Sequence, residues 1–129
     1  MKRLFQHYEG VIQGLIGKRL KNLKCICDKT SKNVILIWLE SDNSWFRIFI
    51  DGTYCGVEKY NIDESQNDAE VDDDLLIEYK KEVDGLTINN AIVKSWILPE
   101  ITLIIELSNS TKLILNCNKN EICVLDFNK

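Results

Sequence analysis

The fold is decided at residues 34–50, which read VILIWLESDNSWFRIFI. The first six residues of this stretch are all apolar and do not alternate with polar ones, which indicates a strand buried on both faces. Residues 41–44, Ser-Asp-Asn-Ser, have the composition of a turn. Residues 45–50 are apolar or aromatic again apart from one arginine, so the sequence predicts a β-hairpin.

Short apolar segments separated by turn residues continue on both sides of this hairpin. After Gly17 the apolar residues recur with a period of two, which is typical of a strand. Residues 61–74 contain almost no apolar side chains and many acidic ones. We therefore expect a first antiparallel meander over 17–60, an acidic linker over 61–74 and a second meander over 75–127.

The two meanders resemble each other when Gly17 is aligned with Gly85 and two residues are deleted from the hairpin of the first meander. The apolar residues 35–37 then meet 103–105. This match indicates an internal duplication. Any two β-meanders share turns and apolar strands, so chance similarity is the alternative.

The N-terminal segment has another period. Its apolar residues recur at spacings of three and four, which predicts an amphipathic helix over 2–15. They are Leu4, Phe5, Tyr8, Val11, Ile12, Leu15 and Ile16. The expected fold is a single α+β domain over 1–129, mainly antiparallel β, in which this helix covers two meanders that form a sandwich or a partly open barrel.

Charge is segregated along the chain, whose formal net charge is −4. Residues 1–33 hold eight basic and two acidic residues, whereas residues 58–84 hold eleven acidic and three basic ones. Such an acidic stretch is either a solvated loop or a surface whose negative field speeds encounter with a basic partner. The basic cluster at 18–24 lacks interleaved aromatic residues, so we do not expect nucleic acid as the partner.

Aromatic residues around the hairpin are the second group of candidate contacts, because such residues anchor protein interfaces when they are partly exposed. We interpret Trp38 and Phe46 as core residues and Trp45, beside the turn, as a candidate contact. The predicted partner-binding residues are Asp63, Glu64, Asp68, Glu70, Asp72, Asp73, Asp74, Trp45, Tyr54 and Tyr60.

Five cysteines, at positions 25, 27, 55, 117 and 123, form no CxxC pair. The sequence shows no signal peptide and no membrane-spanning run, so we interpret them as reduced, half-buried thiols of a cytoplasmic protein. Cys25, Cys27, Cys117 and Cys123 could in principle hold zinc, but C-x-C is a poor substitute for the usual ligand spacing. We expect no metal, no cofactor and no membrane contact.

Catalytic motifs are absent from the sequence. The single histidine, His7, lies beside no recognisable nucleophile, and no phosphate-binding glycine loop or nucleophile elbow occurs. Acid–base catalysis needs carboxylates fixed in place, whereas the carboxylates of 63–74 lie on an expected loop. The sequence therefore predicts a protein that is not an enzyme.

Each half opens with a glycine that is followed by strand, turn and strand. The residues that carry this pattern are Gly17-Lys18-Arg19-Leu20, 35–39 with 44–46, and their counterparts Gly85-Leu86 and 103–107 with 110–111. In this architecture and in its acidity, over residues 17–60 and 85–127, the chain resembles the immunity proteins of bacterial toxin systems, including those of contact-dependent growth inhibition. The resemblance implies a small non-catalytic protein that binds a cognate toxin domain, often a basic nuclease, and neutralises it. It carries over no binding residue, because the contact surfaces differ between such families.

A second hypothesis is a β-domain that binds a small ligand. Its pocket would lie between the two meanders and would combine apolar walls with a few convergent polar groups.

Overall fold

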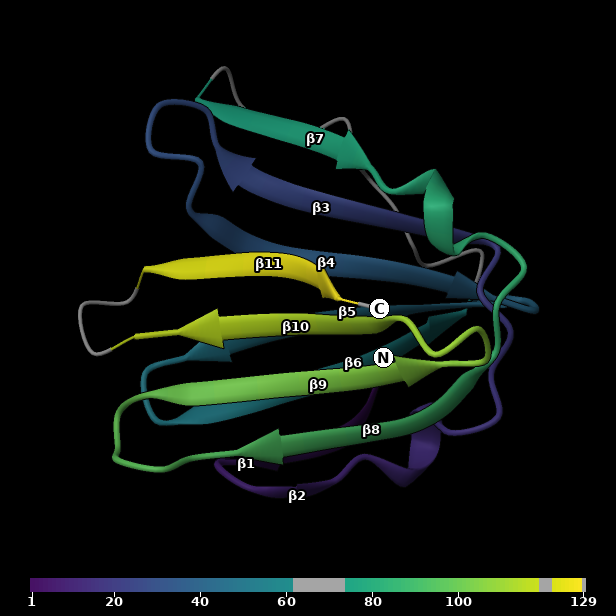
Figure 1. The fold of residues 1–129 in the computed structure, drawn as a ribbon, viewed down its shortest axis with the longest axis horizontal. Helices are drawn as coiled ribbons and strands as arrows, with labels where there is room; N and C mark the ends of the chain where they lie inside the picture. The colour runs from purple at the N-terminus through teal and green to yellow at the C-terminus, as the bar shows by residue number, and fades with distance from the viewer. Residues whose placement is uncertain (62–73, 119–121, 129) are drawn as a thin grey trace.

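The structure is a computed structural model that describes residues 1–61, 74–118 and 122–128. Two antiparallel β-sheets lie face to face, as Figure 1 shows. Strands make up 64% and helical turns 5% of the fold, so the expected α+β class is wrong and the protein is mainly antiparallel β. Within the described residues, no helix is long and apolar enough to cross a membrane.

The six-stranded sheet contains the predicted hairpin near its centre, and all its neighbouring strands are antiparallel. Its strands follow in the spatial order β1 (Lys2–His7), β6 (Tyr54–Asn61), β5 (Ser44–Asp51), β4 (Val34–Ser41), β3 (Asn22–Asp28) and β7 (Leu75–Tyr79).

The five-stranded sheet is built mostly from the second half of the chain. Its strands follow in the order β11 (Cys123–Asn128), β10 (Lys112–Cys117), β9 (Ile101–Leu107), β8 (Ile88–Lys94) and β2 (Gly10–Val11). Two short 3-10 helices precede β3 and β8, namely η1 (Gln13–Leu15) and η4 (Lys81–Val83).

The predicted helix over 2–15 is not present, because this segment forms β1, β2 and η1. A β-bulge in β1 leaves both Leu4 and Phe5 half-buried instead of on opposite faces. A Cβ on Gly14 would lie 2.9 Å from Leu4 Cδ1, so the glycine lets Leu4 pack against η1. A bulged strand, a turn and a 3-10 helix therefore reproduce the apolar spacing of a helix.

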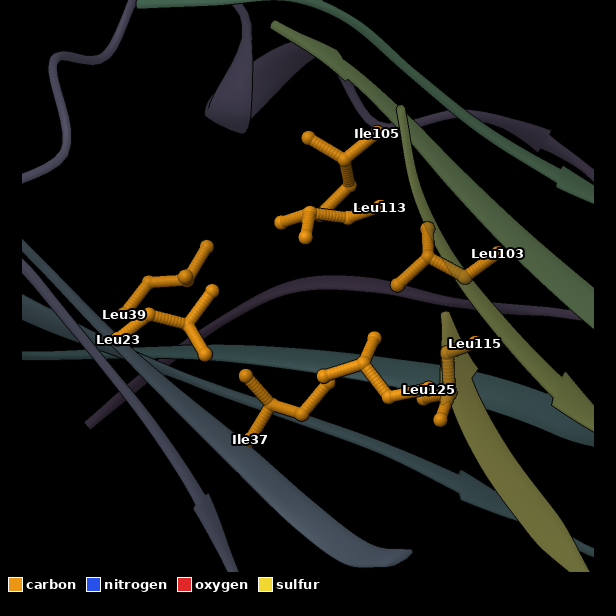
Figure 2. A pocket seen from close by; sticks show the side chains of 8 residues that line it. All are labelled: Leu23, Ile37, Leu39, Leu103, Ile105, Leu113, Leu115 and Leu125. Carbon is orange, nitrogen blue, oxygen red and sulfur yellow. The ribbon is translucent and has the colours of Figure 1, made fainter. Parts of the chain in front are cut away.

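An apolar core fills the space between the sheets. Figure 2 shows leucine and isoleucine side chains of both sheets that point toward one another. They are Leu23, Ile37 and Leu39 of the six-stranded sheet and Leu103, Ile105, Leu113, Leu115 and Leu125 of the five-stranded sheet. The cavity that these side chains leave is about 10 Å³, which is room for at most one water molecule.

Two crossings anchored by glycines join the halves of the chain. Gly17 N–H donates to the Ile88 carbonyl at 2.8 Å, and Gly85 N–H donates to the Leu20 carbonyl at 2.7 Å. Each bond maps onto the other when Gly17 is aligned with Gly85, because Leu20 then meets Ile88. Both glycines have positive φ angles, +90° and +84°, which L-residues with a Cβ rarely adopt. The same local conformation therefore occurs twice.

The correspondence extends to the neighbouring strands. Ile12 N–H donates to the Ala91 carbonyl at 2.9 Å, and Lys80 N–H donates to the Leu23 carbonyl at 3.0 Å. As a result β2, from the first half, joins the five-stranded sheet, and β7, from the second half, joins the six-stranded sheet. The halves exchange a strand reciprocally, a relation that chance similarity between two meanders does not require.

Gly17→Ala and Gly85→Ala should each lower the free energy of unfolding by about 1–2 kcal/mol, because a Cβ is disfavoured at positive φ. The two losses should be similar, since the positions are equivalent. Urea unfolding followed by tryptophan fluorescence measures both. Gln13→Ala, at an exposed residue without positive φ, is the control and should change the value by less than about 0.5 kcal/mol. A loss at only one glycine would contradict the equivalence.

Candidate functional site

The face of the six-stranded sheet that points away from the core carries a line of large side chains. The strand register places one residue of each strand directly opposite the next, so residues distant in sequence form one surface. In order across the sheet, this outer row is Tyr79, Lys24, Trp38, Arg47, Glu58 and Arg3.

Glu58 lies at the centre of a hydrogen-bonded network in the outer row. Its side chain is only 7% exposed and accepts a hydrogen bond from Arg47 Nη1 at 2.9 Å. The Tyr60 hydroxyl donates to the same carboxylate at 3.2 Å, and Arg3 Nη2 lies 3.5 Å from its other oxygen. A buried carboxylate needs such partners to offset its lost hydration. The network therefore fixes the orientation of Arg47 and Tyr60.

Trp38, Trp45 and Tyr60 form an aromatic cluster along the outer row. The ring centroid of Trp38 lies 6.3 Å from that of Trp45 and 5.4 Å from that of Tyr60. Lys24 Nζ lies 4.5 Å from the centroid of the Trp45 ring, which is a cation–π contact. The three rings are half-buried, so each is held by neighbours and still presents surface to solvent.

The predicted aromatic contacts fall into two places. Trp45 and Tyr60 lie directly opposite each other on β5 and β6, within the aromatic cluster. Tyr54 lies at the other end of β6, edge-on to Phe49 with 6.2 Å between ring centroids. The Arg47 guanidinium, 4.8 Å from the centroid of the Phe49 ring, lies between the two places.

The interpretation of Trp38 as a core residue is wrong, although Phe46 is buried in the core as expected. Strand β4 alternates in burial from Leu36 onward: Ile37 and Leu39 are buried in the core, while Leu36 and Trp38 are half-buried on the other face. The sequence hides this alternation because the outward positions of β4 also carry apolar side chains.

Of the acidic candidate residues, only Asp74 lies within the described part of the chain. Asp74 is described and exposed, and its carbonyl accepts the N–H of Lys29 at 2.8 Å, next to the start of β7. The other six lie outside the described residues: Asp63, Glu64, Asp68, Glu70, Asp72 and Asp73. Their contact with a partner stays a prediction.

Sequence reasoning missed Lys24, Arg47 and Glu58. The signal that could have found Arg47 and Glu58 is the register of the strands, which the lengths of the turns determine. A two-residue turn at 42–43 places Arg47 opposite Trp38, and the turn at 52–53 then places Glu58 opposite Arg47.

The cysteine interpretation needs one correction. Cys117 and Cys123, opposite each other on β10 and β11, form a disulfide, whereas Cys25, Cys27 and Cys55 are free and buried. The pairing takes two sulfurs from the alternative zinc site. Among the described residues, no group of three or more histidine, cysteine or acidic side chains could hold a metal ion.

The free thiols are core side chains. Burial raises the pKa of Cys55 and of Cys25 to about 12, and a hydrogen bond with Cys27 adds to the effect at Cys25. Burial also raises the pKa of Cys27. A thiol that stays neutral in a packed strand is a poor nucleophile, so these positions carry no sign of chemistry.

Comparisons with protein-family models, with curated proteins and with solved structures returned no match. Tryptophan, tyrosine and arginine are the residue types that dominate binding energy at protein interfaces, and the outer row gathers all three in fixed positions.

Arg47→Ala should lower the free energy of unfolding by about 2 kcal/mol, because the buried Glu58 carboxylate loses its closest donor. Arg3→Ala is the control: this side chain is 55% exposed, so its loss should cost less than about 1 kcal/mol. Urea unfolding of both variants measures the difference. Equal losses of stability in the two variants would contradict the claim that Arg47 is the main partner of Glu58.

The buried thiols should make the protein less stable in alkali. Unfolded thiols ionise near their ordinary pKa of 9.0, whereas folded Cys25 and Cys55 stay protonated up to about 12. Stability is therefore fully present below pH 9 and falls as the pH rises toward 12. Urea unfolding between pH 8 and 11 should show a shallower fall for the variant that combines Cys25→Ala with Cys55→Ala. Parallel curves for the two proteins would contradict this assignment.

Proposed function

We propose that the protein is a non-catalytic binding domain that captures a cognate protein and neutralises it, as an immunity protein does with its toxin domain. The outer row and the aromatic cluster support this proposal. Trp38, Trp45, Tyr60 and Arg47 are held in place by one another and by Glu58 before any partner binds. Side chains fixed in this way lose little conformational entropy on binding.

The shape of the site favours a protein over a small molecule. The outer row lies on a sheet face, whereas small-ligand sites are concave. The cavity that the leucine and isoleucine side chains leave between the sheets, about 10 Å³, is too small for a ligand and so favours the first hypothesis over the second. A groove of about 560 Å³ between the β1–β2 turn and the end of β8 is open to solvent.

A basic partner agrees with two features. Residues 58–84 hold eleven acidic and three basic residues, a charge that attracts a basic protein at long range. At short range, aromatic faces bind arginine and lysine side chains through cation–π contacts. Lys24 already makes this contact with Trp45 inside the protein, so the aromatic cluster is a place where a cation binds.

The first experiment is to express the protein together with its flanking reading frames and to purify it through a tag at low salt. We expect a stoichiometric basic protein to co-purify. Its toxicity to bacteria should disappear when the protein is present. A preparation without a partner, together with no protection of growth, would overturn the proposal.

Trp45→Ala should weaken binding of that partner about thirtyfold, as the loss of a central aromatic anchor does. Isothermal titration calorimetry measures the dissociation constant. Trp96→Ala is the matched control, because Trp96 is 81% exposed in the loop between β8 and β9, away from the outer row. Its dissociation constant should stay within about twofold of the parent value. The reverse result would place the interface at that loop and contradict the proposed site.

A further inference from the structure

The two halves of the sandwich differ in the number of strands. On its outer side β6 pairs with β1, residues Lys2–His7. Its counterpart β11 ends the five-stranded sheet, and no strand in the described part of the chain pairs with its outer side, here called the open edge. In Figure 1, β11 is the last strand of the front sheet, with β3 and β7 of the other sheet beyond it.

Strand register shows that β11 occupies the place of β6. The five-stranded sheet has its own row of directly opposed residues, which runs Val11, Ile92, Ile104, Ile114 and Asp126. Its members Val11, Ile92 and Asp126 match Tyr79, Lys24 and Glu58 of the outer row at the offset that aligns Gly17 with Gly85. The outer row continues from Glu58 to Arg3, whereas the second row ends at Asp126.

Asp126 is therefore an exposed carboxylate at a position whose equivalent faces an arginine. In the six-stranded sheet, Arg3 of β1 lies directly opposite Glu58 of β6 and 3.5 Å from its carboxylate. A strand added beside β11 would bring one of its own side chains opposite Asp126 in the same way. A basic side chain there would make a cross-strand pair of opposite charges, which stabilises an antiparallel sheet.

The backbone of β11 can accept such a strand. Cys123 N–H donates to Asn33 Oδ1, which lies outside the five-stranded sheet. Because backbone groups alternate in direction along a strand, those of Leu125 and Phe127 point to the open edge as well. Edge groups of this kind are the template for strand addition by a partner chain.

The residue that lies beneath the edge strand differs between the two halves. In the first half, the Phe5 ring of β1 packs over Gly10, where a Cβ would lie 3.3 Å from the ring. In the second half, Glu78 of β7 stands at the equivalent position, 3.4 Å from Lys80. By this equivalence, a strand added beside β11 would meet Glu78 where β1 meets Gly10, so it would have less room and a further carboxylate nearby.

We propose that the open edge of β11 binds one extended segment of a partner protein as a sixth strand, with a basic side chain of that segment opposite Asp126. This goes beyond the proposed function, because it uses the other sheet and no residue of the aromatic cluster. The charge selects a basic segment over a second copy of β11. That strand contains no basic residue, so self-pairing would leave Asp126 without a counter-charge.

The test uses the full chain and a peptide copied from β1. The probe is residues 1–8 with Phe5→Val, because the place beside β11 is narrower than the one that β1 fills. Amide hydrogen exchange, followed by NMR, should slow at least about fivefold at Leu125 and Phe127 in saturating peptide. The amide of Val124 points toward β10 and should not change. Unchanged exchange at Leu125 and Phe127 would overturn the proposal, as would new protection confined to β6.

Charge variants test the role of Asp126. Asp126→Lys should weaken peptide binding about fivefold or more, and a peptide with Lys2→Glu and Arg3→Glu should not bind the parent protein. Glu106→Lys is the matched control, since it makes the same charge change on the same sheet, on β9. Equal effects of the two protein variants would show a general charge effect and contradict the site. Sedimentation that reveals a dimer with Leu125 already protected would assign the edge to a second copy and overturn the proposal as well.

Discussion

The reciprocal hydrogen bonds at Gly17 and Gly85 are the constraint on which the rest of the structure depends. Each bond lies where the chain passes from one sheet to the other, and each needs a backbone angle that glycine adopts at little cost. A bridge between Arg19 and Thr87, which are themselves equivalent positions of the two halves, lies between the two crossings. Since each half supplies a strand to the sheet of the other, neither half completes its own core. The single core between the sheets follows from this exchange.

Local sequence patterns predict those parts of the fold that local physics determines. The hairpin at 34–50 and the later meander strands follow from turn residues and apolar runs, and the equivalence of Gly17 and Gly85 is visible in the sequence. The match of 35–37 with 103–105 is wrong by two residues, because the strand register places Ile37 and Leu39 level with Leu103 and Ile105. The prediction of a helix over 2–15 is wrong because the apolar spacing of this segment fits a helix as well as a bulged strand followed by a turn. Pairing of β1 with β6, a strand distant in the sequence, decides between the two. The pairing of β7 with β3 instead of β8 is equally non-local.

The candidate site divides in the same way. Trp45 and Tyr60 could be found from the sequence, because aromatic residues near turns stand out on their own. Arg47 and Glu58 could not be found in this way, because they become neighbours only when two consecutive turns place their strands side by side. Trp38 was misplaced because its strand is apolar on both faces, so composition could not distinguish the core face from the outer face. Register, rather than residue type, defines this site.

Comparison of the equivalent rows separates what folding requires from what it does not. Facing the core, the two halves agree: Leu39 of β4 has the same place in the register as Ile105 of β9, and both are buried. Facing outward they differ, since Trp38 and Arg47 in one sheet take the places of Ile104 and Ile114 in the other. The same strand arrangement therefore forms with plain isoleucines in the row. A requirement of the fold would act on both sheets alike. The aromatic and charged row of the six-stranded sheet therefore supports the proposed contact with a partner, which its residue types and fixed geometry fit.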